Sequence, residues 1–61
     1  MDPDTAWDQI TSSVYPLDER ADSAAALVDW IGAGGCLPAD LPLPIVINRC
    51  AVTLSEAWQH R

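Results

Sequence analysis

The stretch WIGAGGCLP, residues 30–38, constrains the fold of this 61-residue chain more than any other feature. It places three glycines and a closing proline directly after a run with helical spacing. Glycine adopts the left-handed conformation that ends a helix at little cost, and proline prevents a helix from resuming. We therefore expect a helix to end here, with Gly34 or Gly35 as the first residue beyond it.

The helix that leads into this stop is predicted to begin near Leu17 or Asp18. Its inner stripe has helical spacing and comprises Ala21, Ala24, Leu27, Val28 and Ile31. We expect Leu37 to fold back against Ile31 or Trp30, because such a contact often accompanies a glycine-terminated helix.

A first helix is predicted over residues 3–14. Asp2 suits the N-cap and Pro3 the first helical position, where its missing N–H costs nothing. The expected apolar stripe comprises Ala6, Trp7, Ile10 and Val14. Pro16 should end this helix, because the residue before a proline is pushed out of the helical conformation.

A third helix is predicted over residues 42–59, with Asp40 as its cap. Its stripe is expected to comprise Val46 or Ile47, Cys50, Ala51, Leu54, Ala57 and Trp58. A short strand over residues 45–47 is the alternative, since three β-formers are consecutive there. Ile45 and Val52 lie seven residues apart on another face of this helix, which indicates a second apolar contact surface.

These elements predict an all-α fold, a small three-helix bundle in a single domain over residues 1–61. With 49% hydrophobic residues the chain should fold rather than stay disordered. A chain of this length buries only about 60% of its unfolded surface, so a monomer would be marginally stable. We therefore expect oligomerisation to complete the bundle.

The chain is acidic, with a formal net charge of −6, and eight of its nine acids lie in residues 1–40. Negative charge disfavours direct binding to nucleic acid and to anionic membranes. The acidic start, Met1–Asp4, does not fit a signal peptide, and no apolar run has the roughly 18 residues of a membrane span. The expected location is the cytoplasm.

The sequence contains only weak candidates for catalytic or ligand-binding motifs. We therefore expect that the protein is not an enzyme and has no cofactor, metal or small-molecule substrate. A phosphate loop precedes a helix and carries a lysine, whereas these glycines follow a helix and the chain has no lysine. The possible metal ligands Cys36, Cys50 and His60 have spacings that match no zinc pattern. His60 is a poor candidate base because it is the penultimate residue.

The two cysteines are expected to be reduced, since cytoplasmic disulfides are rare. Cys50 falls in an apolar stripe and should behave as a small buried hydrophobe, whereas Cys36 lies in the glycine turn and should be more exposed. A disulfide between Cys36 and Cys50 is the alternative.

Three tryptophans are more than so small a domain can readily bury, and tryptophan is a preferred anchor at protein interfaces. We expect Trp7 in the core, and Trp30 and Trp58 either at its edge or in an interface. The first hypothesis is a non-enzymatic protein-interaction module that forms homo-oligomers. Its predicted interface comprises Trp30, Leu37, Ile45, Val52 and Trp58.

The second hypothesis is an acidic decoy that imitates nucleic acid and blocks a basic protein surface. Its acids would be Asp4, Asp8, Asp18, Glu19, Asp22 and Asp29. A decoy requires a salt-sensitive partner, whereas an apolar interface survives high salt.

Residues 1–40 combine a Met-Asp-Pro-Asp start, a short first helix and a second helix that closes as ALVDWIGAGGCLPADL. This combination resembles small acidic proteins of actinobacteria and their phages, whose second helix ends in Trp-Leu-x-x-Gly-Gly-x-Leu-Pro. The chain departs from that pattern with Ile31 in place of leucine and Cys36 in place of an aromatic residue. The resemblance implies a phage or mobile-element accessory protein that binds a host protein, and it implies no catalytic activity.

Overall fold

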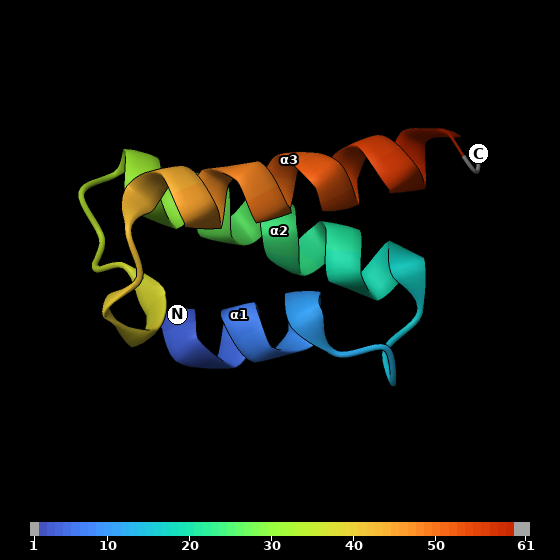
Figure 1. The fold of residues 1–61 in the computed structure, drawn as a ribbon, viewed down its shortest axis with the longest axis horizontal. Coiled ribbons are helices and arrows are strands. Elements are labelled where there is room, and N and C mark those ends of the chain that lie inside the picture. Colours follow the sequence, from blue (N-terminus) through green and yellow to red (C-terminus); the bar gives the residue numbers. More distant parts are fainter. Residues whose placement is uncertain (1, 60–61) are drawn as a thin grey trace.

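The computed structural model describes residues 2–59 and confirms the all-α three-helix bundle (Figure 1). Its elements, in chain order, are α1 (Pro3–Thr11), α2 (Leu17–Gly32), a short 3-10 helix η1 (Pro38–Asp40) and α3 (Leu43–Gln59). The strand considered for residues 45–47 is therefore wrong, because these residues lie within α3. Within the described chain no helix is both long enough and apolar enough to span a membrane.

The central helix α2 packs against both α1 and α3, and successive helices run in opposite directions (Figure 1). The buried cluster between the helices comprises Ala6, Ile10, Ala24, Leu27, Val46 and Cys50. Trp7, which was expected in the core, is half-buried against this cluster, as Trp30 also is. Five of the largest fully buried side chains, Ile10, Leu27, Val46, Pro38 and Cys50, define a small core.

The start of α1 is the one predicted. The Asp2 carboxylate accepts hydrogen bonds from the backbone N–H of Asp4 (3.1 Å) and from the hydroxyl of Thr5 (2.9 Å). These bonds satisfy part of the N-terminal end of the helix, where several N–H groups have no partner within it.

The end of α1 was predicted too late, at residue 14. Helix α1 ends at Thr11, because Ser12 is extended and its hydroxyl accepts the Val14 N–H in a local turn. Val14 is 85% exposed, so its place in the predicted stripe is wrong. Val14 would lie on the apolar stripe only if the helix continued to residue 14. The Ser12 hydroxyl instead makes a local hydrogen bond that competes with the helix.

The start of α3 also differs from the prediction in its cap. Asp40 does not cap α3, because Ala39 and Asp40 both adopt left-handed φ angles (50° and 55°) in a turn closed by the Leu41 N–H and the Pro38 carbonyl (3.0 Å). The Asp4 carboxylate of α1 accepts the Ala39 N–H (2.6 Å) and ties this turn to the bundle. Helix α3 then begins at Leu43, one residue later than predicted.

Candidate functional site

The predicted interface residue Trp30 completes the C-terminal end of α2. Gly34 has a φ of 93° and donates its N–H to the Ile31 carbonyl (3.0 Å), while Gly35 donates to the Trp30 carbonyl (2.9 Å). This pair of hydrogen bonds is the Schellman arrangement, which satisfies carbonyls that the helix itself leaves open. Of the two glycines predicted for the left-handed position that follows the helix, Gly34 occupies it, directly after the C-cap residue Ala33.

The indole of Trp30 lies over Gly35 and fixes the chain that leaves the helix. A Cβ atom at Gly35 would overlap the indole ring, so only glycine fits beneath it. The indole Nε1 donates a hydrogen bond to the Cys36 carbonyl (3.0 Å), which gives the half-buried ring a polar partner. Trp30 therefore has a structural role, because its ring holds the turn that follows α2.

Leu37 is half-buried and packs against the core cluster, as Ile31 and Trp30 also do. Trp30 lies in the last turn of α2, and Leu37 lies in the segment between α2 and η1. This end of α2 is near the start of α3 (Figure 1). Trp58 belongs to the last turn of α3, at the opposite end of the bundle. The five predicted interface residues consequently do not gather in one patch.

Helix α3 has three faces that are defined by their spacing and exposure. The inner stripe is buried and comprises Val46, Cys50, Thr53 and Ala57. The apolar seam lies beside it and comprises Ile47, Ala51, Leu54 and Trp58. The outer face alternates apolar and charged residues and comprises Ile45, Arg49, Val52 and Glu56.

The predicted interface residues Ile45 and Val52 lie on the outer face, where they are 53% and 43% exposed. Their neighbours on that face are Arg49 and Glu56, both exposed. The outer face is therefore a mixed surface in which each apolar side chain lies beside a charge.

The apolar seam is uncharged along its whole length. Ile47 is 38% exposed and Trp58 is 73% exposed, Ala51 is exposed, and Leu54 is half-buried against the core cluster. Leu43, itself partly exposed, extends the apolar surface toward the start of the helix. Exposed apolar side chains in a continuous row mark a protein-interaction surface more often than scattered ones do.

Sequence reasoning assigned most of the seam to the core. Because Val46–Ile47 and Cys50–Ala51 are adjacent apolar pairs, the apolar arc of α3 is wider than one neighbouring helix can cover. Helix α2 covers the side of this arc that contains Val46 and Cys50. Thr53, a polar residue with 3% exposure, was missed as a core position. The doubled apolar pairs were the available signal that α3 carries two apolar faces.

Both cysteines are free thiols, as predicted, and the alternative of a disulfide between them is wrong. Cys36 is exposed, and Cys50 is buried in the inner stripe, where burial raises the pKa of its thiol. A raised pKa keeps the thiol neutral and lowers its reactivity. Among the described residues, no three His, Cys, Asp or Glu side chains are grouped to hold a metal ion. His60 lies outside the described residues.

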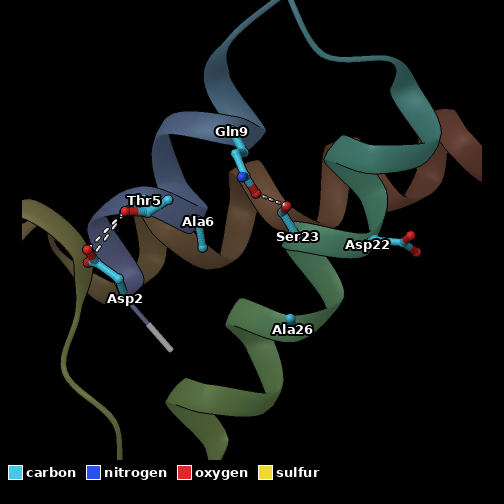
Figure 2. A pocket seen from close by; sticks show the side chains of 7 residues that line it. All are labelled: Asp2, Thr5, Ala6, Gln9, Asp22, Ser23 and Ala26. Atoms are coloured by element: carbon cyan, nitrogen blue, oxygen red, sulfur yellow. Dashed lines mark hydrogen bonds between the residues drawn. The ribbon is translucent and has the colours of Figure 1, made fainter.

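The hollow between α1 and α2 is an open depression lined by two alanines and short polar side chains (Figure 2). Ser23 donates a hydrogen bond to the Gln9 side chain across it (2.6 Å), and the Thr5 hydroxyl is bonded to Asp2. Asp22 points away from α1. The polar groups that line the depression are thus largely hydrogen-bonded to each other. The depression is also too open for a small-molecule site, which is normally enclosed.

The acids of the second hypothesis are all exposed. Asp18, Asp22 and Asp29 recur at spacings of four and seven, so they share the side of α2 opposite the buried Ala24 and Leu27. On α1, Asp4 is engaged with the Ala39 N–H. The acidic surface is therefore real but dispersed over two helices.

In comparisons with known proteins, no family model matches this chain, and no curated protein or solved structure is significantly similar to it. The resemblance to actinobacterial and phage proteins stays a prediction.

Proposed function

We propose that this chain is a non-enzymatic protein-interaction module that self-associates through the apolar seam of α3. The observation that carries the proposal is the width of the apolar arc on α3, which exceeds what α2 covers and leaves Ile47 and Trp58 exposed. Of the residues first predicted for the interface, Trp58 belongs to this seam. Ile45 and Val52 provide the competing surface on the same helix.

The distribution of charge favours a second copy of the chain as the partner. Each copy carries a net charge of −6, so two copies repel each other wherever their acidic surfaces meet. Eight of the nine acids precede residue 41, and the charged residues of α3, Arg49 and Glu56, both lie on the outer face. The seam is therefore a surface along which two copies can approach without placing like charges in contact.

The size of the chain supports the same partner. A standard interface buries about 800 Å² on each side, which would be roughly a fifth of the 4059 Å² exposed by one copy. Helix α3 has 17 residues and is thus about 25 Å long, close to the 30 Å long axis of the bundle. Contact along α3 would add apolar burial that the small core of one copy lacks.

The direct test is to place a charge on the seam and to place the same charge on the outer face. Ile47→Glu should weaken self-association at least about a hundredfold, or about 2.7 kcal/mol, because a carboxylate would be desolvated without a partner. Sedimentation equilibrium over a range of concentrations measures this dissociation constant.

Ile45→Glu is the matched control. It makes the same chemical change two residues earlier on the same helix, at a side chain that is at least as exposed. We expect it to leave the dissociation constant within about threefold of the parent value, because exposed substitutions have small effects. Equal weakening by both variants, or weakening by Ile45→Glu alone, would move the interface to the outer face. Thermal unfolding of each variant separates lost association from lost fold.

The acidic decoy is the second candidate, and the stripe formed by Asp18, Asp22 and Asp29 favours it. Replacing these three acids by asparagine should abolish binding to a basic protein such as a histone and leave the seam unaffected. Such binding should also fall steeply as salt rises, because exposed charges are screened over about 10 Å at 0.1 M salt. Binding that persists in high salt would contradict the decoy function.

A further inference from the structure

We infer that two copies pair through the apolar seam of α3 in an antiparallel orientation. Along the helix, the two-fold axis lies at the height of residues 52 and 53. This inference rests on the proposed self-association and adds its register. In this register Ile47 of one copy lies level with Trp58 of the other, and Ala51 lies level with Leu54. Each contact occurs twice, as a two-fold symmetric interface requires.

The spacing of the apolar seam is that of a paired helix. Ile47, Ala51, Leu54 and Trp58 are separated by four, three and four residues. This alternation repeats every seven residues and keeps one apolar row facing a second helix along its length. The seam therefore matches a helical partner better than a strand or a flat surface.

The sizes of the seam residues select the antiparallel orientation. In a parallel pair each residue meets its own copy, so two Ala51 side chains would leave a gap between layers that hold two Leu54 and two Ile47 side chains. In the antiparallel pair, Ala51 meets Leu54 and the smaller Ile47 meets the large Trp58. Small and large side chains then alternate across the interface, which is the arrangement that packs without voids.

The edges of the seam are compatible with burial. On one side lie Asn48 and Ser55, which are exposed and uncharged. On the other side lie Cys50 and Ala57, which belong to the buried inner stripe. No charged residue of α3 would therefore be desolvated beside the seam in this register. By contrast, the outer face has the same four, three, four spacing but would bury Arg49 and Glu56, which is costly.

The two orientations differ in distances that a disulfide can detect. Positions 47 and 58 are eleven residues apart. In the antiparallel pair, the two copies of position 58 are therefore separated by about 16 Å along the helix, at 1.5 Å per residue. A disulfide requires Cβ atoms within about 4.5 Å. Only the cross pair, 47 with 58, then meets this requirement.

The experiment uses Ile47→Cys and Trp58→Cys, each in a chain in which the exposed Cys36 is replaced by serine. The two variants are mixed in equal amounts and equilibrated in a glutathione redox buffer, and the disulfide-linked products are identified by intact mass and peptide mapping. We expect the disulfide between positions 47 and 58 in roughly tenfold excess over either like-with-like product, because only this pair is within bonding distance.

An excess of the like-with-like products would overturn the antiparallel register in favour of a parallel pair. A mixed product only about twice as abundant as either like-with-like product, which is the statistical result for equal amounts of two variants, would show that no register is preferred. Absence of any disulfide, while sedimentation still gives the mass of two chains, would overturn the register and leave self-association standing. A parent chain with the mass of one copy would overturn both.

A second measurement keeps the seam intact, in case Trp58→Cys itself prevents pairing. Gln59→Cys carries a nitroxide spin label at an exposed residue outside the seam, again with Cys36 replaced by serine. In the antiparallel register position 59 lies level with position 46, so the two labels are at least about 20 Å apart. A label separation well below this distance would contradict the antiparallel register.

Discussion

Trp30 illustrates how one side chain can be structural although its residue type suggests binding. Its indole covers Gly35 and donates to the Cys36 carbonyl, while the backbone of Gly34 and Gly35 closes the end of α2. The unusual composition of residues 30–38 thus has a local explanation: the helix end needs a left-handed glycine, and the indole needs a second glycine beneath it.

Substitution of these glycines tests that explanation. Gly35→Ala should lower the free energy of unfolding by roughly 2 kcal/mol, because the new methyl group overlaps the indole. In a chain that already carries Trp30→Ala, the same substitution should cost less than about 0.5 kcal/mol. Urea unfolding at one fixed protein concentration measures both values.

Gly32→Ala is the control, because a Cβ atom there has open space and Gly32 is the last residue of α2. It should raise the free energy of unfolding by about 0.5 kcal/mol or more. An equal cost of Gly35→Ala with and without Trp30 would show that the ring does not impose the glycine.

At the scale of the elements, most of the fold could be predicted from the sequence, because its helix boundaries depend on local chemistry. Asp2, Pro3 and Gly34 act on their own neighbours, and each of these signals held. Pro16 does not end α1, because the helix already stops at Thr11, before an extended Ser12. Asp40 failed because its conformation depends on a distant contact, the hydrogen bond between Asp4 and Ala39.

The candidate interaction surface could be predicted only in part, for a related reason. Periodicity shows that α3 is apolar over a wide arc, but it cannot say which side of that arc faces α2. The structure settles this by burying Val46 and Thr53 and leaving Ile47 and Trp58 exposed. Ile45 and Val52 were predicted as a contact surface because they lie outside the main apolar stripe. The residues of the seam lie within that stripe, so periodicity assigned them to the core.

The N-terminus of α1 makes a pH-dependent contribution that can be isolated. The hydrogen bond from the Thr5 hydroxyl, with those from the backbone N–H groups of Thr5 and Asp4, holds the pKa of Asp2 below its usual value. Because this pKa is lower in the folded chain than in the unfolded chain, the ionised carboxylate stabilises the fold above about pH 4. That contribution is lost as the pH falls through the lowered pKa.

Asp2→Asn keeps a side-chain oxygen at the cap but removes the charge. We expect the parent chain to be more stable than Asp2→Asn at pH 7, and the difference to shrink as the pH falls below about 4 and through the lowered pKa of Asp2. Thermal unfolding of both chains across this range measures the difference. A difference independent of pH would show that the charge at Asp2 adds nothing to the cap.

At the scale of the whole molecule, charge and apolar surface are separated along the chain. Eight of the nine acids precede residue 41, whereas α3 holds only Glu56 and carries the widest apolar arc. Under the proposed self-association, the acidic surface would repel a second copy and the apolar seam would attract it. The stability of the fold would then depend on concentration, because association stabilises the folded state.

The most direct measurement is the mass of the parent chain in solution, by light scattering behind a sizing column, over a range of concentrations, with and without reductant. Self-association through an apolar seam predicts the mass of two chains, reached as concentration rises and retained in high salt, since no ion pair holds the copies together. A mass of one chain at every concentration would contradict self-association. A two-chain mass that disappears in reductant would assign the dimer to a disulfide at Cys36 and contradict the account of α3.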